Sequence, residues 1–145
     1  MACKLIMTLL SESQEGNCGD DWKYEIQSKV FNEGLKGEGS ILVPKHTLES
    51  GTAEKPYGSP EPLTLYDGEC LTELLIRLYL TATEVDLFKN DIGKASMEFK
   101  IACPGPGVGS VSKEVDIAAG VRESPGILIK NSVFTSSIRF DLVCE

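Results

Sequence analysis

The residues best suited to bind a metal ion fall in two acidic stretches, at positions 12–21 and 84–93. Calcium takes about six to eight oxygen ligands from carboxylates, side-chain amides, backbone carbonyls and water. Because carboxylates a few residues apart in a loop supply such oxygens, we expect the two stretches to share one or two calcium ions. The expected ligands are Asn17, Asp20, Asp21, Glu84, Asp86 and Asp91. The alternative is that these charges only solvate the loops.

Catalytic motifs are scarce in this sequence. Its single histidine, His46, lies in a polar segment, and we expect it to be an ordinary surface residue. The glycine-rich run at 104–110 ends without the Lys-Ser/Thr pair of a phosphate-binding loop, and its prolines lack the amides that cradle phosphate. We therefore expect no catalytic site and no enzyme. The least favoured alternative is a small hydrolase or lectin in which Glu73 and Asp116 converge.

The cysteines give a prediction about the compartment. The sequence holds five of them, at positions 3, 18, 70, 103 and 144. They form no CxxC pair and no zinc-ligand spacing, and an odd, scattered set is typical of buried free thiols in a reducing compartment. We therefore expect a cytoplasmic protein. Pairing of Cys3 with Cys144, near the two chain ends, stays open.

Length and charge limit the classes of partner. The 145 residues are typical of one domain, and we treat positions 1–145 as a single unit. The opening apolar run is expected to be a first strand rather than a secretory leader, and no run approaches the roughly 18 apolar residues of a membrane span. The net charge of −8 argues against nucleic acid and against unassisted binding to anionic membranes.

Strands are the elements that must position these residues. Apolar and polar residues alternate with a period of two at 22–31, 97–101 and 138–142, as a half-buried strand requires. The apolar segment 71–83 also fits helical spacing, but its composition favours a central strand covered on both faces. Further strands are expected at 4–10, 40–43, 62–66, 111–117 and 126–130. With Gly, Pro, Asn and Asp between them, these segments predict a single all-β antiparallel sandwich.

The two acidic stretches resemble the calcium-binding loops of C2 domains. The residues of the second stretch that carry the resemblance are Glu84, Asp86, Phe88, Asn90, Asp91, Ile92 and Gly93. The first stretch is similar in leading through Gly19-Asp20-Asp21 into the aromatic strand start Trp22-Lys23-Tyr24. Glu84 stands where the family usually has Asp, the last part of the loop is one residue shorter, and no basic lipid-binding strand is evident.

The resemblance implies a Greek-key β-sandwich of about eight strands that binds calcium and phospholipid. It also implies that Leu87 and Phe88 at the loop tip contact a membrane or partner. The leading hypothesis is therefore a calcium-responsive binding module that engages a lipid headgroup, a protein or a glycan. The alternative is a metal-free structural or assembly domain that uses open sheet edges or the side chains of Leu75 and Tyr79.

Overall fold

The computed structural model describes residues 2–87, 89–105, 109–123 and 130–145. Within these residues it has eight β-strands and no helix. The strands are β1 (Ala2–Gly16), β2 (Asp21–Phe31), β3 (Leu35–Thr47), β4 (Leu63–Glu69), β5 (Glu73–Glu84), β6 (Asp91–Ala102), β7 (Ser110–Glu123) and β8 (Lys130–Cys144). All the strand pairs are antiparallel, which confirms the expected all-β antiparallel sandwich.

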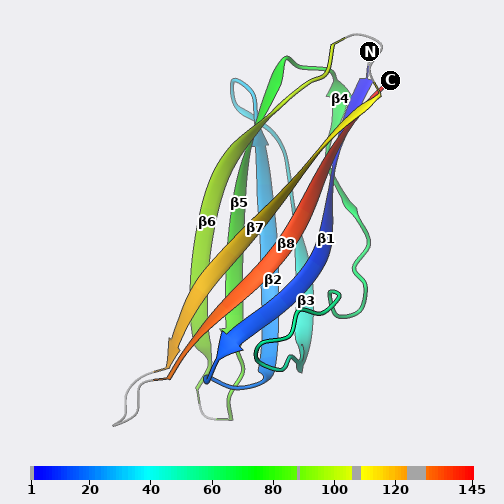
Figure 1. The fold of residues 1–145 in the computed structure, drawn as a ribbon. Coiled ribbons are helices and arrows are strands. Elements are labelled where there is room, and N and C mark those ends of the chain that lie inside the picture. Colours follow the sequence, from blue (N-terminus) through cyan, green and yellow to red (C-terminus); the bar gives the residue numbers. More distant parts are fainter. Residues whose placement is uncertain (1, 88, 106–108, 124–129) are drawn as a thin grey trace.

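The strands form two four-stranded sheets. Sheet A has the order β4-β1-β8-β7, and sheet B has the order β3-β2-β5-β6. Figure 1 shows them as two layers with their strands running along the same long direction. The chain passes from one sheet to the other after β1, β3, β4 and β6. These crossings bring residues from both sheets together at the ends of the sandwich.

The core lies between the two sheets, where the inward residues of each strand meet. Trp22, Tyr24 and Ile26 are buried in β2, as the alternation predicts. The ring centroid of Phe134, in β8 of the opposite sheet, lies 5.7 Å from that of Trp22 and 4.6 Å from that of Tyr24. These aromatic contacts across the interior add to the burial of apolar area that drives the two sheets together.

Several strands are longer than the sequence predicts. β1 continues to Gly16, through residues 12–16 that we expected to belong to an acidic loop, because β8 pairs with β1 along this whole stretch. Residues 67–69, expected to be a turn, belong to β4 and pair with the start of β1. Backbone pairing thus carries polar residues into strands despite their weak strand preference. Of the strand expected at 126–130, positions 126–129 lie outside the described residues.

Segment 71–83 is a strand rather than a helix, as expected, but it is not covered on both faces. In β5 the side chains of Leu74, Ile76 and Leu78 are buried in the core, whereas Arg77 is exposed on the outer face of sheet B. No strand or helix packs on that face among the residues that the structure describes, so one side of β5 faces solvent. None of the described residues forms a helix long and apolar enough to cross a membrane.

The two ends of the sandwich differ in what they bring together. The chain termini meet at one end, where Ala2 N donates to Glu145 O (3.1 Å) and Glu145 N donates to Ala2 O (2.9 Å) (Figure 1). At the other end lie the close of β5 and the starts of β2 and β6. There Val85 N donates to Asp21 O (2.7 Å), which ties the β5–β6 loop to β2. We call the first the terminal end and the second the acidic end.

Candidate functional sites

Three carboxylates gather at the acidic end. Glu84 closes β5, Asp91 opens β6, and the two residues lie directly opposite each other in the strand pairing. Their side chains are 3% and 4% exposed, while Asp86 in the connecting loop is exposed. One carboxylate oxygen from each of Glu84, Asp86 and Asp91 lies within 4.8 Å of the other two. Such a spacing suits oxygen ligands that converge on one cation.

The carboxylate of Asp91 is not fully hydrogen-bonded by the described residues. Its Oδ2 is buried and accepts no hydrogen bond from any residue that the structure describes. A buried carboxylate oxygen without a partner is costly, and a second carboxylate directly across the strand pair adds repulsion. Binding of a cation would satisfy this oxygen and offset the repulsion.

The first acidic stretch reaches this site through a glycine. Gly19 has a φ of +146°, and a Cβ at this position would lie 2.2 Å from Glu84 Oε1. Gly19 O is itself held by Trp22 Nε1 (2.9 Å) and Gln14 Nε2 (3.2 Å). The backbone of the β1–β2 connection is therefore pressed against the Glu84 carboxylate, and only glycine leaves room for this contact.

The other residues expected to bind calcium lie in the β1–β2 connection and at the start of β2. Asp20 and Asp21 are exposed, and neither belongs to the described group of close carboxylates. Asn17 is exposed, and its Oδ1 accepts a hydrogen bond from Asn131 N (3.0 Å), which fixes the connection to β8. Leu87 is 92% exposed at the tip of the β5–β6 loop. Phe88, expected beside it as a membrane contact, lies outside the described residues.

A second buried carboxylate, Glu12, was not expected to be a site residue. It is 2% exposed, and its Oε1 accepts hydrogen bonds from Tyr24 Oη (2.9 Å) and Tyr57 N (2.8 Å). Its Oε2 is in hydrogen-bond contact with His46 Nε2, while His46 Nδ1 lies 2.7 Å from Pro44 O. The two ring nitrogens of His46 thus face two different acceptors, the Pro44 carbonyl at Nδ1 and the Glu12 carboxylate at Nε2.

The expectation that His46 is a surface residue is wrong, because it is only 8% exposed. The ring of Tyr57 stacks on it, with centroids 4.5 Å apart. The pairing of β2 with β3 shifts register next to Pro44 and Lys45, both of which face solvent, and this shift turns His46 inward. The two bulged residues thus reverse the alternation that the sequence suggests.

Burial and the charge of Glu12 raise the pKa of Tyr24, with the hydrogen bond to Glu12 adding to the effect. Tyr24 therefore stays a neutral donor to the carboxylate at any ordinary pH.

Residues 48–57 cover this region, since Glu12 and Glu54 exchange two backbone hydrogen bonds of 2.9 and 2.8 Å. A hollow of about 460 Å³ beside His46 and Tyr57 opens to this segment. We regard the network as structural, because the protein itself supplies every partner of Glu12.

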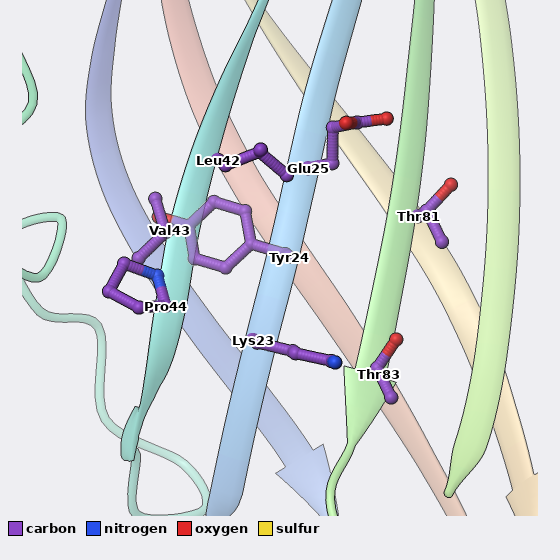
Figure 2. Close-up of a pocket in the computed structure, with 8 residues that line it drawn as sticks. All are labelled: Lys23, Tyr24, Glu25, Leu42, Val43, Pro44, Thr81 and Thr83. Atoms are coloured by element: carbon purple, nitrogen blue, oxygen red, sulfur yellow. The ribbon is translucent and has the colours of Figure 1, made fainter.

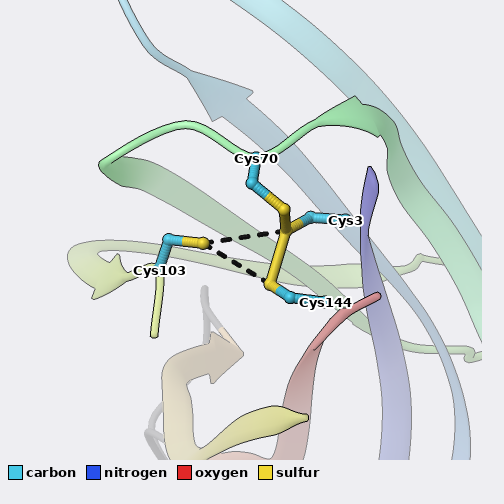
Figure 3. Close-up of side chains that lie close together, drawn as sticks. All are labelled: Cys3, Cys70, Cys103 and Cys144. Atoms are coloured by element: carbon cyan, nitrogen blue, oxygen red, sulfur yellow. Dashed lines mark hydrogen bonds between the residues drawn. A yellow bond between two sulfur atoms is a disulfide. The ribbon is translucent and has the colours of Figure 1, made fainter. Parts of the chain in front are cut away.

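The cysteines are not scattered in the folded chain. One sulfur from each of Cys3, Cys70, Cys103 and Cys144 lies within 4.8 Å of the other three, at the terminal end (Figure 3). This group was not expected from the sequence, because the four residues are far apart along the chain and have no zinc-ligand spacing. Cys18 is apart from them, and it is buried with its Sγ directed at Val121 O (3.5 Å).

Other surface features carry less chemistry. A groove of about 400 Å³ crosses the outer face of sheet B, where Lys23 of β2 extends toward Thr83 of β5 and Leu42 lies on β3 (Figure 2). Its lining includes no histidine or cysteine, and we assign no reaction to it. Glu73 and Asp116, the carboxylates of the hydrolase alternative, are exposed on the outer faces of different sheets and do not converge.

Comparison with known proteins adds no relative to this description. A scan of the sequence against protein-family models found no match, and a search of curated proteins found none.

Proposed function

We propose that this chain is a calcium-responsive binding module that engages anionic lipid headgroups through the acidic end of a C2-like sandwich. The observation that carries the proposal is the buried pair of opposed carboxylates, Glu84 and Asp91, with Asp86 within 4.8 Å of both. Asp91 is buried directly across the strand pair from the buried Glu84, and its Oδ2 accepts no hydrogen bond from any described residue, so a neutral side chain at position 91 would cost less free energy. A divalent cation with oxygen ligands offsets that cost.

The loop between these carboxylates supports the choice of lipid. Leu87 stands 92% exposed beside Asp86, so an apolar side chain and the ion site share one loop tip. The net charge of −8 repels an anionic membrane in the absence of a cation. Calcium held by Glu84, Asp86 and Asp91 would bridge the loop to lipid phosphates, and Leu87 would then insert between the headgroups.

Calorimetric unfolding tests the calcium site. A ligand that binds only the folded state at a hundredfold excess over its Kd adds about 2.7 kcal/mol of stability. At about 2–4 °C per kcal/mol for a chain of this size, millimolar calcium should raise the unfolding midpoint of chelator-treated protein by about 5–10 °C. Asp91→Asn should remove this rise and should also raise the calcium-free midpoint, because it relieves the repulsion with Glu84.

Glu114→Gln is the matched control, since it removes an exposed carboxylate from β7, well away from the acidic end. This variant should keep the full calcium response. An unchanged midpoint in millimolar calcium would refute the ion site and leave the metal-free interaction domain as the better hypothesis.

Sedimentation with phosphatidylserine vesicles tests the lipid step separately. Leu87→Ser should lower calcium-dependent binding at least tenfold without changing the calcium midpoint shift. The control is Leu42→Ser, because Leu42 is another exposed leucine, at 71%, on the outer face of sheet B. A calcium midpoint shift with no vesicle binding would redirect the search to a protein or glycan partner.

A further inference from the structure

The four clustered cysteines come from four separate segments of the chain. Cys3 is near the start of β1 and Cys144 ends β8, while Cys70 directly follows β4 and Cys103 directly follows β6. Figure 3 shows the four side chains pointing toward one another, with Cys103 entering from the side opposite Cys3. Cys103 extends from sheet B and the other three from sheet A, so the sulfurs meet between the two layers.

Backbone pairing holds these residues in place. Cys3 and Cys144 are directly opposite each other in the β1–β8 pair, and Cys144 N donates to Gly109 O (2.8 Å). Cys103 N donates to Thr72 O (3.0 Å), which positions Cys103 against the segment that holds Cys70. The strand ends and these hydrogen bonds therefore fix the backbone from which the four side chains converge.

No single disulfide accounts for all four sulfurs. The structure joins Cys3 Sγ to both Cys70 Sγ and Cys144 Sγ, yet one sulfur forms only one disulfide, and Cys103 is a free cysteine. Cys103 Sγ lies 3.4 Å from Cys144 Sγ and 3.7 Å from Cys3 Sγ. In a tetrahedral site with metal–sulfur bonds of about 2.3 Å, the sulfurs are about 3.8 Å apart, close to these two distances.

We propose that Cys3, Cys70, Cys103 and Cys144 bind one zinc ion as a tetrathiolate site. Four thiolates in a tetrahedral arrangement select zinc or iron over the hard cations that carboxylates prefer. On binding, the four thiols release four protons to solvent and the thiolates take up one Zn²⁺, so the complex carries a charge of −2. This site is at the terminal end and does not depend on the calcium proposal.

The role that follows is structural. All four ligands come from the protein, which leaves no open position for a substrate. The ion would join both chain ends to each other and fasten sheet A to sheet B, where Cys103 is the only ligand from sheet B. Cys3 and Cys144 are 2% and 5% exposed, so the metal would be largely shielded from competing ligands.

Metal content and cobalt spectroscopy test the proposal on the full chain. Protein purified with a phosphine reductant and without chelator should contain one zinc per chain by elemental mass spectrometry. Replacement of zinc by Co²⁺ should give the visible bands of tetrahedral cobalt together with intense thiolate-to-cobalt absorption. Addition of zinc to the reduced, metal-free chain in weakly buffered solution should release close to four protons per ion.

Cys103→Ser should weaken zinc binding at least a hundredfold, since Cys103 is half-buried and its replacement leaves the sheet pairing intact. Cys18→Ser is the control, because Cys18 is a cysteine outside the group, and it should bind zinc like the wild type. Reduced wild-type protein that takes up neither zinc nor cobalt would overturn the proposal, as would Cys103→Ser with unchanged affinity. Isolation as a disulfide-linked, metal-free chain that fails to bind zinc after reduction would also overturn it.

Discussion

Two buried carboxylate regions show opposite ways of keeping charge inside this sandwich. Glu12 is surrounded by donors from its own chain: the Tyr24 hydroxyl, the Tyr57 amide and the His46 ring. Asp91, as deeply buried, leaves Oδ2 without a donor among the described residues and lies across from Glu84. The first arrangement is complete within the protein, whereas the second is the one at which we propose that a cation binds.

The contrast separates structural charge from functional charge. A buried ionised group is tolerated when partners compensate its lost hydration, and it is costly when they do not. Burial alone therefore does not mark a site in this protein. What distinguishes the acidic end is that Asp91 Oδ2 is buried and accepts no hydrogen bond from any described residue.

Truncation of the two carboxylates should give the largest difference between the regions. Glu12→Ala leaves the Tyr24 hydroxyl and the His46 ring buried without their acceptor, and should lower the free energy of unfolding by about 3–5 kcal/mol. Asp91→Ala in calcium-free buffer should cost less than about 1 kcal/mol, because the relief of repulsion with Glu84 offsets the lost packing. Urea unfolding in the presence of chelator measures both values.

Glu12→Gln refines the same comparison. Its amide oxygen keeps the hydrogen bonds of Tyr24 and Tyr57, and its amide group donates to a neutral His46 ring, so the cost should be about 1 kcal/mol. Equal losses for Glu12→Ala and Asp91→Ala would break the comparison, because Asp91 would then be as well supported by the protein as Glu12.

Alternation made the strands and much of the core predictable. Where it was unbroken, as at Trp22, Tyr24 and Ile26, the inward residues were identified correctly from the sequence. Glu12 and His46 lie beyond the strands expected at 4–10 and 40–43, so their burial was not predicted. A shift in the β1–β8 register between Leu9 and Ser11 moves Glu12 to the inner face, as the shift near Pro44 does for His46. A single inserted residue reverses every later side chain, and no composition signal marks it.

The cysteine group was missed because ligand spacing along the chain was the wrong criterion. In an antiparallel eight-stranded sandwich, every even-numbered strand ends where β1 begins. Cys3 starts β1, and Cys70, Cys103 and Cys144 stand at the ends of β4, β6 and β8. The group therefore follows from strand parity, once the strand boundaries are known. These boundaries are set by the pairing of each strand with its neighbours. The strands expected from the sequence were shorter than the observed ones.

Replacement of Gly19 tests whether its close contact with the Glu84 carboxylate matters for stability and for calcium binding. Gly19→Ala should lower the free energy of unfolding by about 2–3 kcal/mol, because the backbone conformation is unfavourable for alanine and the added Cβ meets Glu84 Oε1 at 2.2 Å. It should also reduce the calcium midpoint shift by at least half, since Glu84 must move. Calorimetry with and without calcium measures both effects.

Gly34→Ala is the matched control for this variant. Gly34 also has a positive φ, of +120°, but a Cβ there meets nothing within 4 Å. It should cost only about 1–2 kcal/mol of backbone strain and leave the calcium response unchanged. A normal calcium response in Gly19→Ala would show that the Glu84 carboxylate is not a ligand, which would remove half of the contrast with Glu12.

The loss of stability at alkaline pH tests the Glu12 region. Because burial and Glu12 raise the pKa of Tyr24 in the folded chain, its contribution to stability is complete below the unfolded pKa of about 10 and is lost as the pH rises further. Above that pH the unfolded chain loses a proton that the folded chain retains, so stability should fall by about 1.4 kcal/mol per pH unit from this residue alone.

In Tyr24→Phe the free energy of unfolding should fall less steeply with pH between pH 10 and 11.5, because this contribution is missing. The variant should also be less stable than the wild type at neutral pH, because Glu12 loses a donor. Urea unfolding of both chains across this range gives the difference directly. Identical slopes would mean that Tyr24 ionises inside the folded protein, next to the Glu12 carboxylate. The Glu12 region would then hold two adjacent negative charges, and a hydroxyl donor would no longer distinguish this region from the acidic end.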